Sequence, residues 1–312
     1  MGSEMCIRDR MKVGIDIGGS HVSVGVVNGN GKILEQFEKD YTVQEKQNIM
    51  QVAENFIIEE IKKIREKYEI DKVGVAIPGT ISKDTIVRSV NLGVENYAIK
   101  DILSSKLGNN IEISVLNDAK SAAIAEFNFR KNIESKHNED LNNMLFLTLG
   151  TGIGGAYIYN GKLLSGTKFD GYEFGHMILK EGGIRCNCGK KGCFEKYGSI
   201  LSFKSKCIER LGLQHNISGP ELRKIIGQNL DRLQDIIQEY IYDLAIGLSN
   251  LINIFEPDVT VIGGGFARYD YLLLDLLKKR IVEENLLFNK RENIKIEVAK
   301  LGNDAGIVGA VL

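Results

Sequence analysis

The chain has 312 residues, of which 43% are hydrophobic and 26% are charged. Because single cores stop growing at about 250–300 residues, this length predicts two domains, and the composition excludes a disordered chain. Forty basic and 41 acidic residues give a net charge of −1, which argues against nucleic-acid or anionic-membrane binding and favours small-molecule partners.

The sequence supports neither insertion into a membrane nor secretion. The apolar runs are shorter than the roughly 20 residues needed to cross a bilayer, and no signal peptide is recognisable. Residues 1–10, "MGSEMCIRDR", are polar and patternless, so we interpret them as an expression or sequencing remnant and Met11 as the natural start. A cytoplasmic, reducing location is therefore expected, where clustered cysteines more often bind metal than form disulfides.

The chain is predicted to alternate strands and helices in an α/β pattern. It opens with three short strands joined by Gly and Asn turns, which is an antiparallel start, and then turns to β-α-β. Strands are expected at 11–17, 22–28, 32–39, 72–79, 111–116, 144–149, 259–265 and 293–299. Helices are expected at 45–69, 98–108, 118–130, 198–211, 219–228, 230–255 and 270–285, with a short one at the end.

Two stretches repeat one design of strand, Gly-rich turn, strand and Gly/Asn turn. These are "VGIDIGGSHVSVGVVNGNGK" near the start and "LTLGTGIGGAYIYNGK" in the middle of the chain. The repeat predicts two related halves that pack closely around a cleft, since no low-complexity linker separates them.

Three of the predicted strands end in glycines. "DIGGS", residues 16–20, and "LGTGIGG", residues 149–155, are Gly-rich turns whose bare backbone can approach a phosphate, and "VIGGG", residues 261–265, could carry an adenosine. A Gly-Gly hairpin with a turn-forming Asp needs no ligand, so each turn alone is a weak signal. Because "DIGGS" and "LGTGIGG" occupy corresponding positions in the two repeated stretches, together they suggest two loops that bind one polyphosphate.

Asp118 follows a strand and opens a helix in "LNDAKSAAIAEF". One interpretation is that it is only the N-cap of that helix, which is worth about 1 kcal/mol. The other is that its carboxylate accepts the proton of a substrate hydroxyl as the hydroxyl attacks phosphorus. One residue could do both.

Four potential metal ligands follow the spacing H-x9-C-x-C-x4-C. They are His176, Cys186, Cys188 and Cys193, and one imidazole with three thiolates makes a closed tetrahedral zinc site that leaves no position for catalysis. The alternative is a turn-rich loop with incidental thiols. Cys207 fits a small core residue on an apolar helix pattern.

Taken together, "DIGGS", "NDA", "LGTGIGG", "EFGHM", "CNCGKKGCFE", "VIGGG" and "LGNDAGIVGA" resemble the ROK family of sugar kinases and sugar-responsive repressors. The resemblance runs from Met11 to the end, and the cysteine segment is its most specific element. It implies a two-lobed actin/hexokinase-like (ribonuclease H-like) fold with a cleft. The small lobe would be residues 11–117 and the large lobe 118–312, with the last helix returning to the small lobe.

The resemblance also implies roles for individual residues. Asp118 matches the catalytic base, and sugar-binding positions match Gly79, Asn91, Asn117, Asp118, Glu173, His176 and Glu195. The two phosphate loops and the adenosine-side turn match Asp16, Gly18, Gly19, Ser20, Gly150, Thr151, Gly152, Gly154, Gly263, Gly264 and Gly265. Zinc would then fasten the loop that presents the last three sugar ligands, with His176 binding the metal through one ring nitrogen and a sugar hydroxyl through the other.

The chain departs from the family pattern at three positions. Ser20 and His21 stand where the family more often has Thr and Lys, so the charge of that Lys is missing, and Val94 stands where Trp is frequent. None of these changes removes a residue that the implied chemistry requires.

The implied activity is transfer of the γ-phosphoryl group of ATP, with Mg²⁺, to a hexose, foremost the 6-hydroxyl of glucose. Alternatives are fructose, mannose, N-acetylmannosamine, N-acetylglucosamine, allose or a β-glucoside. A sugar-sensing repressor of the same family is disfavoured, because a DNA-binding helix-turn-helix would have to precede the first phosphate loop and only four residues separate Met11 from Asp16. A homodimer is the assembly that the resemblance favours.

Overall fold

A computed structural model describes residues 11–108, 110–132, 141–166, 171–214, 216–289 and 295–312. The predicted leader, residues 1–10, lies outside the described residues. The chain divides into two compact units, each with its own sheet and core. Unit 1 contains the described residues of 1–138, 165–171 and 301–312, and unit 2 contains those of 139–164 and 172–300.

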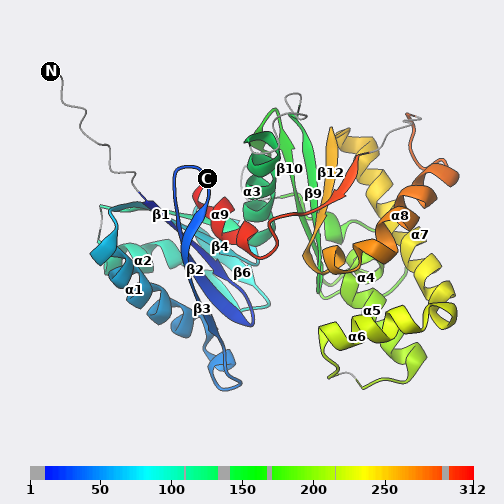
Figure 1. Cartoon of the computed structure of the whole chain (residues 1–312), viewed down its shortest axis with the longest axis horizontal. Helices are drawn as coiled ribbons and strands as arrows, with labels where there is room; N and C mark the ends of the chain where they lie inside the picture. Colours follow the sequence, from blue (N-terminus) through cyan, green and yellow to red (C-terminus); the bar gives the residue numbers. More distant parts are fainter. Residues whose placement is uncertain (1–10, 109, 133–140, 167–170, 215, 290–294) are drawn as a thin grey trace. The chain divides into compact units, whose positions relative to one another are not determined.

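The sheet of unit 1 has the strand order β3-β2-β1-β4-β8. An antiparallel hairpin starts it, because β1 pairs with β2 and β2 with β3, and the sheet continues through two parallel pairs, β1 with β4 and β4 with β8. The strands are β1 (Met11–Ile17), β2 (His21–Val27), β3 (Ile33–Asp40), β4 (Ile70–Ile77) and β8 (Glu112–Asn117). The helices are α1 (Ile49–Lys67), α2 (Ile99–Leu107), α3 (Asp118–Asn132) and α9 (Asp304–Val311), and the short helix η1 (Glu45–Gln47) precedes α1 (Figure 1).

The sheet of unit 2 has the order β11-β10-β9-β12-β13. Its strands are β9 (Met144–Leu149), β10 (Ile153–Tyr159), β11 (Lys162–Leu163), β12 (Val259–Gly263) and β13 (Ile296–Val298). Its helices are η2 (Phe174–His176), α4 (Glu195–Gly198), α5 (Ile200–Leu211), α6 (Gly219–Gln228), α7 (Leu230–Phe255), η3 (Gly264–Arg268) and α8 (Asp270–Glu283). The apolar face of α7 is buried in this unit's core through residues such as Leu244 and Leu248.

The two sheets are built alike. In each, the first three strands along the chain form an antiparallel meander, and two later strands add in parallel beside the first. The prediction of two related halves, made from the repeated strand and turn pattern, is therefore confirmed.

Helix α9 lies flat on the sheet of unit 1 because glycines remove the side chains between them. A Cβ on Gly14 would lie 2.0 Å from the carbonyl oxygen of Ile307, and a Cβ on Gly74 would lie 1.9 Å from that of Ala310. On the helix, a Cβ on Gly309 would lie 1.7 Å from the carbonyl oxygen of Ser121 in α3. No side chain fits at these contacts, so α9 is held against both the sheet and α3 at backbone distance.

Two features differ from the sequence expectations. Helix α3 belongs to unit 1, whereas the expected lobe boundary before Asp118 put it in the large lobe; it joins unit 1 because it packs against α9. A small antiparallel sheet was not predicted at all, and it consists of β5 (Thr80–Ser82), β6 (Thr85–Ser89) and β7 (Val94–Tyr97).

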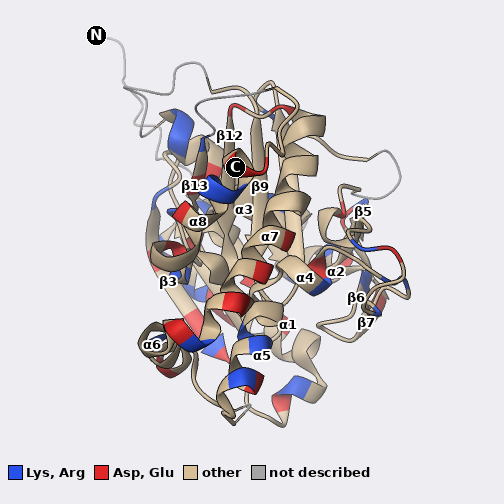
Figure 2. Ribbon diagram, turned by 90° about the vertical axis from the view of Figure 1, so that its right-hand side faces the viewer, with Lys and Arg blue, Asp and Glu red and all other residues tan. Residues whose placement is uncertain are grey.

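Charged side chains of both signs are mixed along the surface. In Figure 2, Lys and Arg segments alternate with Asp and Glu segments along the helices that face the viewer. Several of them pair, as Arg210 does with Asp235 at 2.6 Å. Among the described residues, no helix has the length and apolar character that a bilayer crossing demands.

Candidate functional site

Seven of the predicted site residues of unit 1 lie at or next to one edge of its sheet. The parallel strands β1, β4 and β8 end side by side, with Asp16 paired to Ala76 and Ile77 paired to Asn117. The segments that follow the three strands carry Gly18 to Ser20, Gly79 and Asp118. The carboxyl ends of neighbouring parallel strands are where open α/β sheets bind ligands, so this edge is the first half of the candidate site.

Asp16 is a half-buried carboxylate at this edge. Burial, and secondly the charge of Asp118, raise the pKa of Asp16 from 3.8 to about 7. Two acidic groups held together in this way favour either a shared proton or a bound cation. Space for the Asp16 carboxylate is left by Gly306 in the first turn of α9, where a Cβ would lie 2.5 Å from Asp16 Oδ2.

Tyr41 also lies near Asp16, and the sequence analysis missed it. Its side chain is 6% exposed, and within the described part of the chain its hydroxyl has no hydrogen-bond partner. Burial first, and then the charge of Asp16, raise the pKa of Tyr41. The backbone N–H of Tyr41 donates to the carbonyl of Ser20 at 2.8 Å, which supports the first glycine turn from behind. A tyrosine in a loop after a strand carries no sequence signal for such a position.

Asn117, not Asp118, supplies the side-chain cap of α3. Asn117 Oδ1 accepts from the backbone N–H groups of Ala119 at 3.0 Å and Lys120 at 3.3 Å. Asp118 is the first residue of the helix, and its Oδ1 accepts from the N–H of Ala119 at 2.8 Å. The interpretation of Asp118 as only an N-cap is therefore not what the geometry favours.

The amide of Asn117 is engaged on both sides. Its Nδ2 donates one of its two N–H groups to the carbonyl of Gly79 at 3.0 Å, which leaves the other N–H as the donor for a sugar hydroxyl. Gly79 itself has φ +124°, and a Cβ there would lie 2.4 Å from the carbonyl oxygen of Arg88 in β6. The unpredicted sheet β5-β6-β7 thus determines where Gly79 and Asn117 lie.

Asn91 lies in the connection between β6 and β7. Its carbonyl oxygen would be 3.7 Å from a Cβ on Gly19, so the connection reaches the first glycine turn, and the Asn91 side chain is exposed. Unit 1 therefore brings its predicted phosphate-loop and sugar-side residues into one neighbourhood.

Unit 2 repeats this arrangement at the ends of β9 and β12. These strands are parallel, with Gly263 paired to Thr148. A Cβ on Gly264, which has φ +71°, would lie 2.8 Å from both the Leu149 carbonyl oxygen and Thr148 Oγ1. The predicted adenosine-side turn therefore lies against the start of the predicted second phosphate loop, which begins at Gly150.

Glu195 connects the second glycine turn to the cysteine segment. Its Oε2 accepts from the backbone N–H of Ile153 at 3.2 Å and would lie 2.2 Å from a Cβ on Gly152. Its Oε1 lies 3.8 Å from Cys186 Sγ. A side chain at position 152 would therefore displace the Glu195 carboxylate, whether or not a phosphate binds there.

The predicted zinc ligands come together in unit 2. One ligand atom from each of His176, Cys186, Cys188 and Cys193 lies within 4.8 Å of the other three. Cys188 Sγ lies 3.5 Å from Cys193 Sγ, and Cys186 Sγ lies 3.8 Å from His176 Nδ1. A tetrahedron with Zn–S bonds of about 2.3 Å has S–S edges of about 3.8 Å, so the donor set and its dimensions fit zinc.

The other residues of unit 2 that were predicted to bind sugar flank this cluster. Glu173 is exposed and precedes η2, and its carbonyl accepts from the N–H of His176 at 3.0 Å. Since Nδ1 of His176 faces the thiols, Nε2 is the nitrogen left for another partner. Lys190, from within the cysteine segment, donates to the carbonyl of His176 at 2.8 Å.

We expect about one zinc per chain in purified protein, and a Cys188→Ser variant should lose most of it. Without metal, burial and the neighbouring thiols raise the pKa of Cys193 to about 12, so metal binding must release protons and should weaken at low pH. Elemental analysis measures the zinc. Cys207→Ala is the matched control, because Cys207 is buried in the core outside the cluster; a zinc-free wild type of full activity would contradict the assignment.

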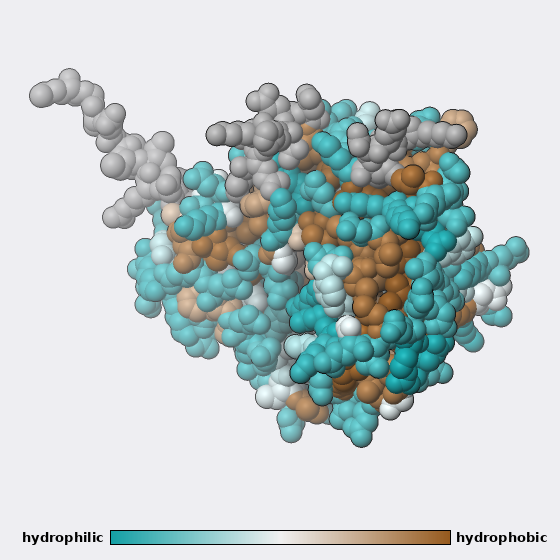
Figure 3. Space-filling model, turned by 45° about the vertical axis from the view of Figure 1, so that its right-hand side comes forward, coloured by the Kyte–Doolittle hydropathy of each residue, from teal (hydrophilic) through white to brown (hydrophobic). Residues whose placement is uncertain are grey.

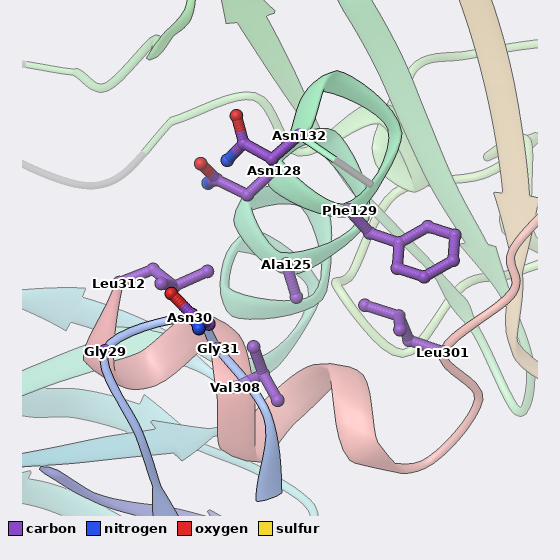
Figure 4. Close-up of a pocket in the computed structure, with 10 residues that line it drawn as sticks. All are labelled: Gly29, Asn30, Gly31, Ala125, Asn128, Phe129, Asn132, Leu301, Val308 and Leu312. Carbon is purple, nitrogen blue, oxygen red and sulfur yellow. The ribbon is translucent and has the colours of Figure 1, made fainter. Parts of the chain in front are cut away.

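A cavity in unit 1 is separate from these residues. It has a volume of about 360 Å³ and lies between the Gly29 to Gly31 turn, α3 and α9 (Figure 4). Asn30, Asn128 and Asn132 are its polar side chains, and none of its ten lining residues is charged. Its lining side chains therefore supply neither a carboxylate nor a cation for phosphoryl transfer.

The comparisons with known proteins cover nearly the whole chain. A model described as the ROK family matches residues 12–312. The glucokinase of Thermotoga maritima is 31% identical, with 96% of this chain and 95% of that protein covered. The N-acetyl-D-glucosamine kinase of Haemophilus influenzae is 29% identical, with 96% and 98% covered. The crystal structure of a ROK family glucokinase from Streptomyces griseus in complex with glucose and AMPPNP matches with a TM-score of 0.78 and 27% identity, covering 96% and 98% of the two chains.

Proposed function

The chain belongs to the ROK family and is an ATP-dependent sugar kinase, and we propose that it phosphorylates glucose at the 6-hydroxyl. The predicted α/β hexokinase-like fold class is thereby confirmed. The observation that carries the proposed chemistry is the pair Asp118 and Asp16 at the edge of the unit 1 sheet, with Asp118 opening α3. Similarity to a glucokinase of Thermotoga maritima supports glucose as the acceptor.

In the proposed reaction the sugar oxygen forms a bond to the γ-phosphorus as the bond to the β–γ bridging oxygen breaks. Asp118 accepts the hydroxyl proton, and the electron pair of the broken bond leaves with ADP. Asp118 is the proposed catalytic residue because its carboxylate lies at a helix start, beside the sheet edge that carries Asp16. The base contributes a factor of ~10²–10⁴.

The glycine turns hold the phosphates in this proposal. Gly18, Gly19 and Ser20 form the first turn and Gly150 to Gly154 the second, and the bare glycine backbone of each can approach a phosphate closely. Gly263 to Gly265 would carry the adenosine. Asp16 fits Mg²⁺ because it is a half-buried carboxylate next to a second one, and oxygen ligands are those that Mg²⁺ prefers. When bound, Mg²⁺ neutralises phosphate charge.

The sugar would be oriented by Asn91, Asn117, Glu173, His176 and Glu195, with Gly79 leaving space beside it. The links from Cys186 to Glu195 and from the cysteine segment to His176 support a structural role for zinc, which would fix these two side chains without touching phosphorus. Selectivity among hexoses then depends on which ring hydroxyls find partners there.

The test is ADP release from Mg-ATP against glucose, fructose, mannose, allose, the two N-acetylated amino sugars and a β-glucoside, with a no-sugar control. We expect glucose to give the highest kcat/KM. N-acetyl-D-glucosamine is the substrate in the name of the Haemophilus influenzae relative. A strong preference for it would support the kinase activity and contradict glucose as the substrate. No turnover with any sugar would favour a sugar-sensing regulator.

We also propose that the protein forms a homodimer. The family resemblance supports it, as do large exposed apolar side chains on unit 2, among them Tyr242, Ile254 and Tyr271. Figure 3 shows continuous apolar surface on one face of the molecule. Sedimentation velocity at micromolar concentration distinguishes a monomer from a dimer.

A further inference from the structure

We propose that His21, Glu38 and Asp40 form a second metal site, which takes a divalent transition-metal ion. One ligand atom from each of the three lies within 4.8 Å of the other two. They belong to unit 1, and no cysteine takes part. The proposal does not depend on the sugar-kinase reaction.

The strand register explains why these three side chains meet. His21 at the start of β2 lies directly opposite Asp40 at the end of β3, and Ser23 lies opposite Glu38. Because side chains alternate between the two faces of a strand, His21, Glu38 and Asp40 all project from the same face. A direct cross-strand pair and its diagonal neighbour are within reach of one ion.

Ser20 fixes the orientation of the His21 ring. Its Oγ lies 3.0 Å from His21 Nδ1, so with Nδ1–H donating to this hydroxyl, Nε2 presents its lone pair. A second hydrogen bond from the ring nitrogen that does not bind the ion is the usual arrangement of histidine ligands and selects the tautomer.

The carboxylates of Glu38 and Asp40 are not neutralised by basic side chains among the described residues. Within the described ranges, neither Glu38 nor Asp40 has an ion pair, whereas Lys39 between them pairs with Glu45 at 2.9 Å. Both carboxylates are exposed and His21 is half-buried, so water can complete the coordination. One imidazole and two carboxylates suit Zn²⁺, Ni²⁺, Co²⁺ or Mn²⁺ better than Ca²⁺ or Mg²⁺, which take oxygen ligands.

The site is distinct from the place of Asp16, although both lie on the same face of the sheet. Asp16 pairs with Ser23 and Ser23 with Glu38, so the Asp16 and Glu38 backbones are two strand spacings apart, about 10 Å. Two-metal catalytic centres need ions about 3.5–4 Å apart. An ion at His21 would therefore act on the protein, by tying the residue after Ser20 to the end of β3.

The experiment titrates Ni²⁺, which suits imidazole, into desalted zinc-loaded protein without nucleotide. Calorimetry should find one nickel site per chain, and paramagnetic broadening in an amide NMR spectrum should fall first on Ser20 and Tyr41. His21→Ala, and separately Glu38→Gln with Asp40→Asn, should weaken this binding by about tenfold or more. The double substitution keeps side-chain shape, so it serves if His21→Ala fails to fold.

Gln36→Ala is the matched control, because Gln36 is exposed on the same face of β3. It should bind nickel as the wild type does. Equal nickel affinity in all variants, or broadening that begins elsewhere in the chain, would overturn the proposal. The zinc content at the cysteine cluster should stay the same in every variant.

Discussion

Asp118→Asn is expected to lose turnover by a factor of ~10²–10⁴, the usual contribution of a general base. The amide keeps the size of the carboxylate but cannot accept the hydroxyl proton at neutral pH. Sugar binding should persist, because it does not require proton transfer. ADP release measures the turnover, and calorimetry with glucose measures the binding.

The structure indicates that Asp118→Asn removes the proton acceptor without disturbing helix α3. The side-chain cap of α3 is Asn117, so Asp118→Asn leaves that cap in place, and an amide oxygen can still accept from the N–H of Ala119. Asp101→Asn on α2 is the control, since Asp101 is an exposed acidic residue in a first helical turn of the same unit. Activity near that of the wild type would show that another group takes the proton.

The sequence predicted the elements that bury apolar residues with a clear period. The strands β1 and β9 and the helices α6 and α7 were predicted to within about a residue, because turn residues flank each apolar run. The repeated strand and turn pattern also predicted the shared topology of the two sheets.

The sheet β5-β6-β7 could not be predicted because its strands are three to five residues long and mostly half-exposed. Such segments have too few buried positions for a period to show. The consequence is functional, since this sheet positions Gly79 and thereby Asn117. The grouping of α3 with unit 1 was missed for a related reason: it depends on backbone contact with α9, nearly 200 residues later.

The candidate site was predicted unevenly. The spacing of His176 and the cysteines identified four side chains that the structure brings together. By contrast, the contact of Glu195 with the glycine turn, and the neighbourhood of Tyr41 and Asp16, arise from tertiary packing that no spacing encodes. The roles of these residues in binding sugar and ATP remain predictions that rest on the family.

Asp16→Asn is expected to stabilise the protein at pH 8 while it reduces turnover. The folded state raises the pKa of Asp16 from 3.8 to about 7, chiefly by burial. The folded protein therefore holds a proton that the unfolded chain has already released, and stability falls as the pH rises from about 4 to about 7. Three pKa units correspond to about 4 kcal/mol, of which about 2 kcal/mol is lost between pH 5.5 and pH 8.

An asparagine at this position does not titrate, so the variant should avoid that loss. Its free energy of unfolding relative to the wild type should rise by about 2 kcal/mol from pH 5.5 to pH 8, measured by denaturant unfolding in magnesium-free buffer. Asp101→Asn should follow the wild type at both values. A variant that is less stable at both would mean that Asp16 holds the fold together; higher stability with lower turnover would mean that the Asp16 charge is maintained for its ligand at the expense of the fold.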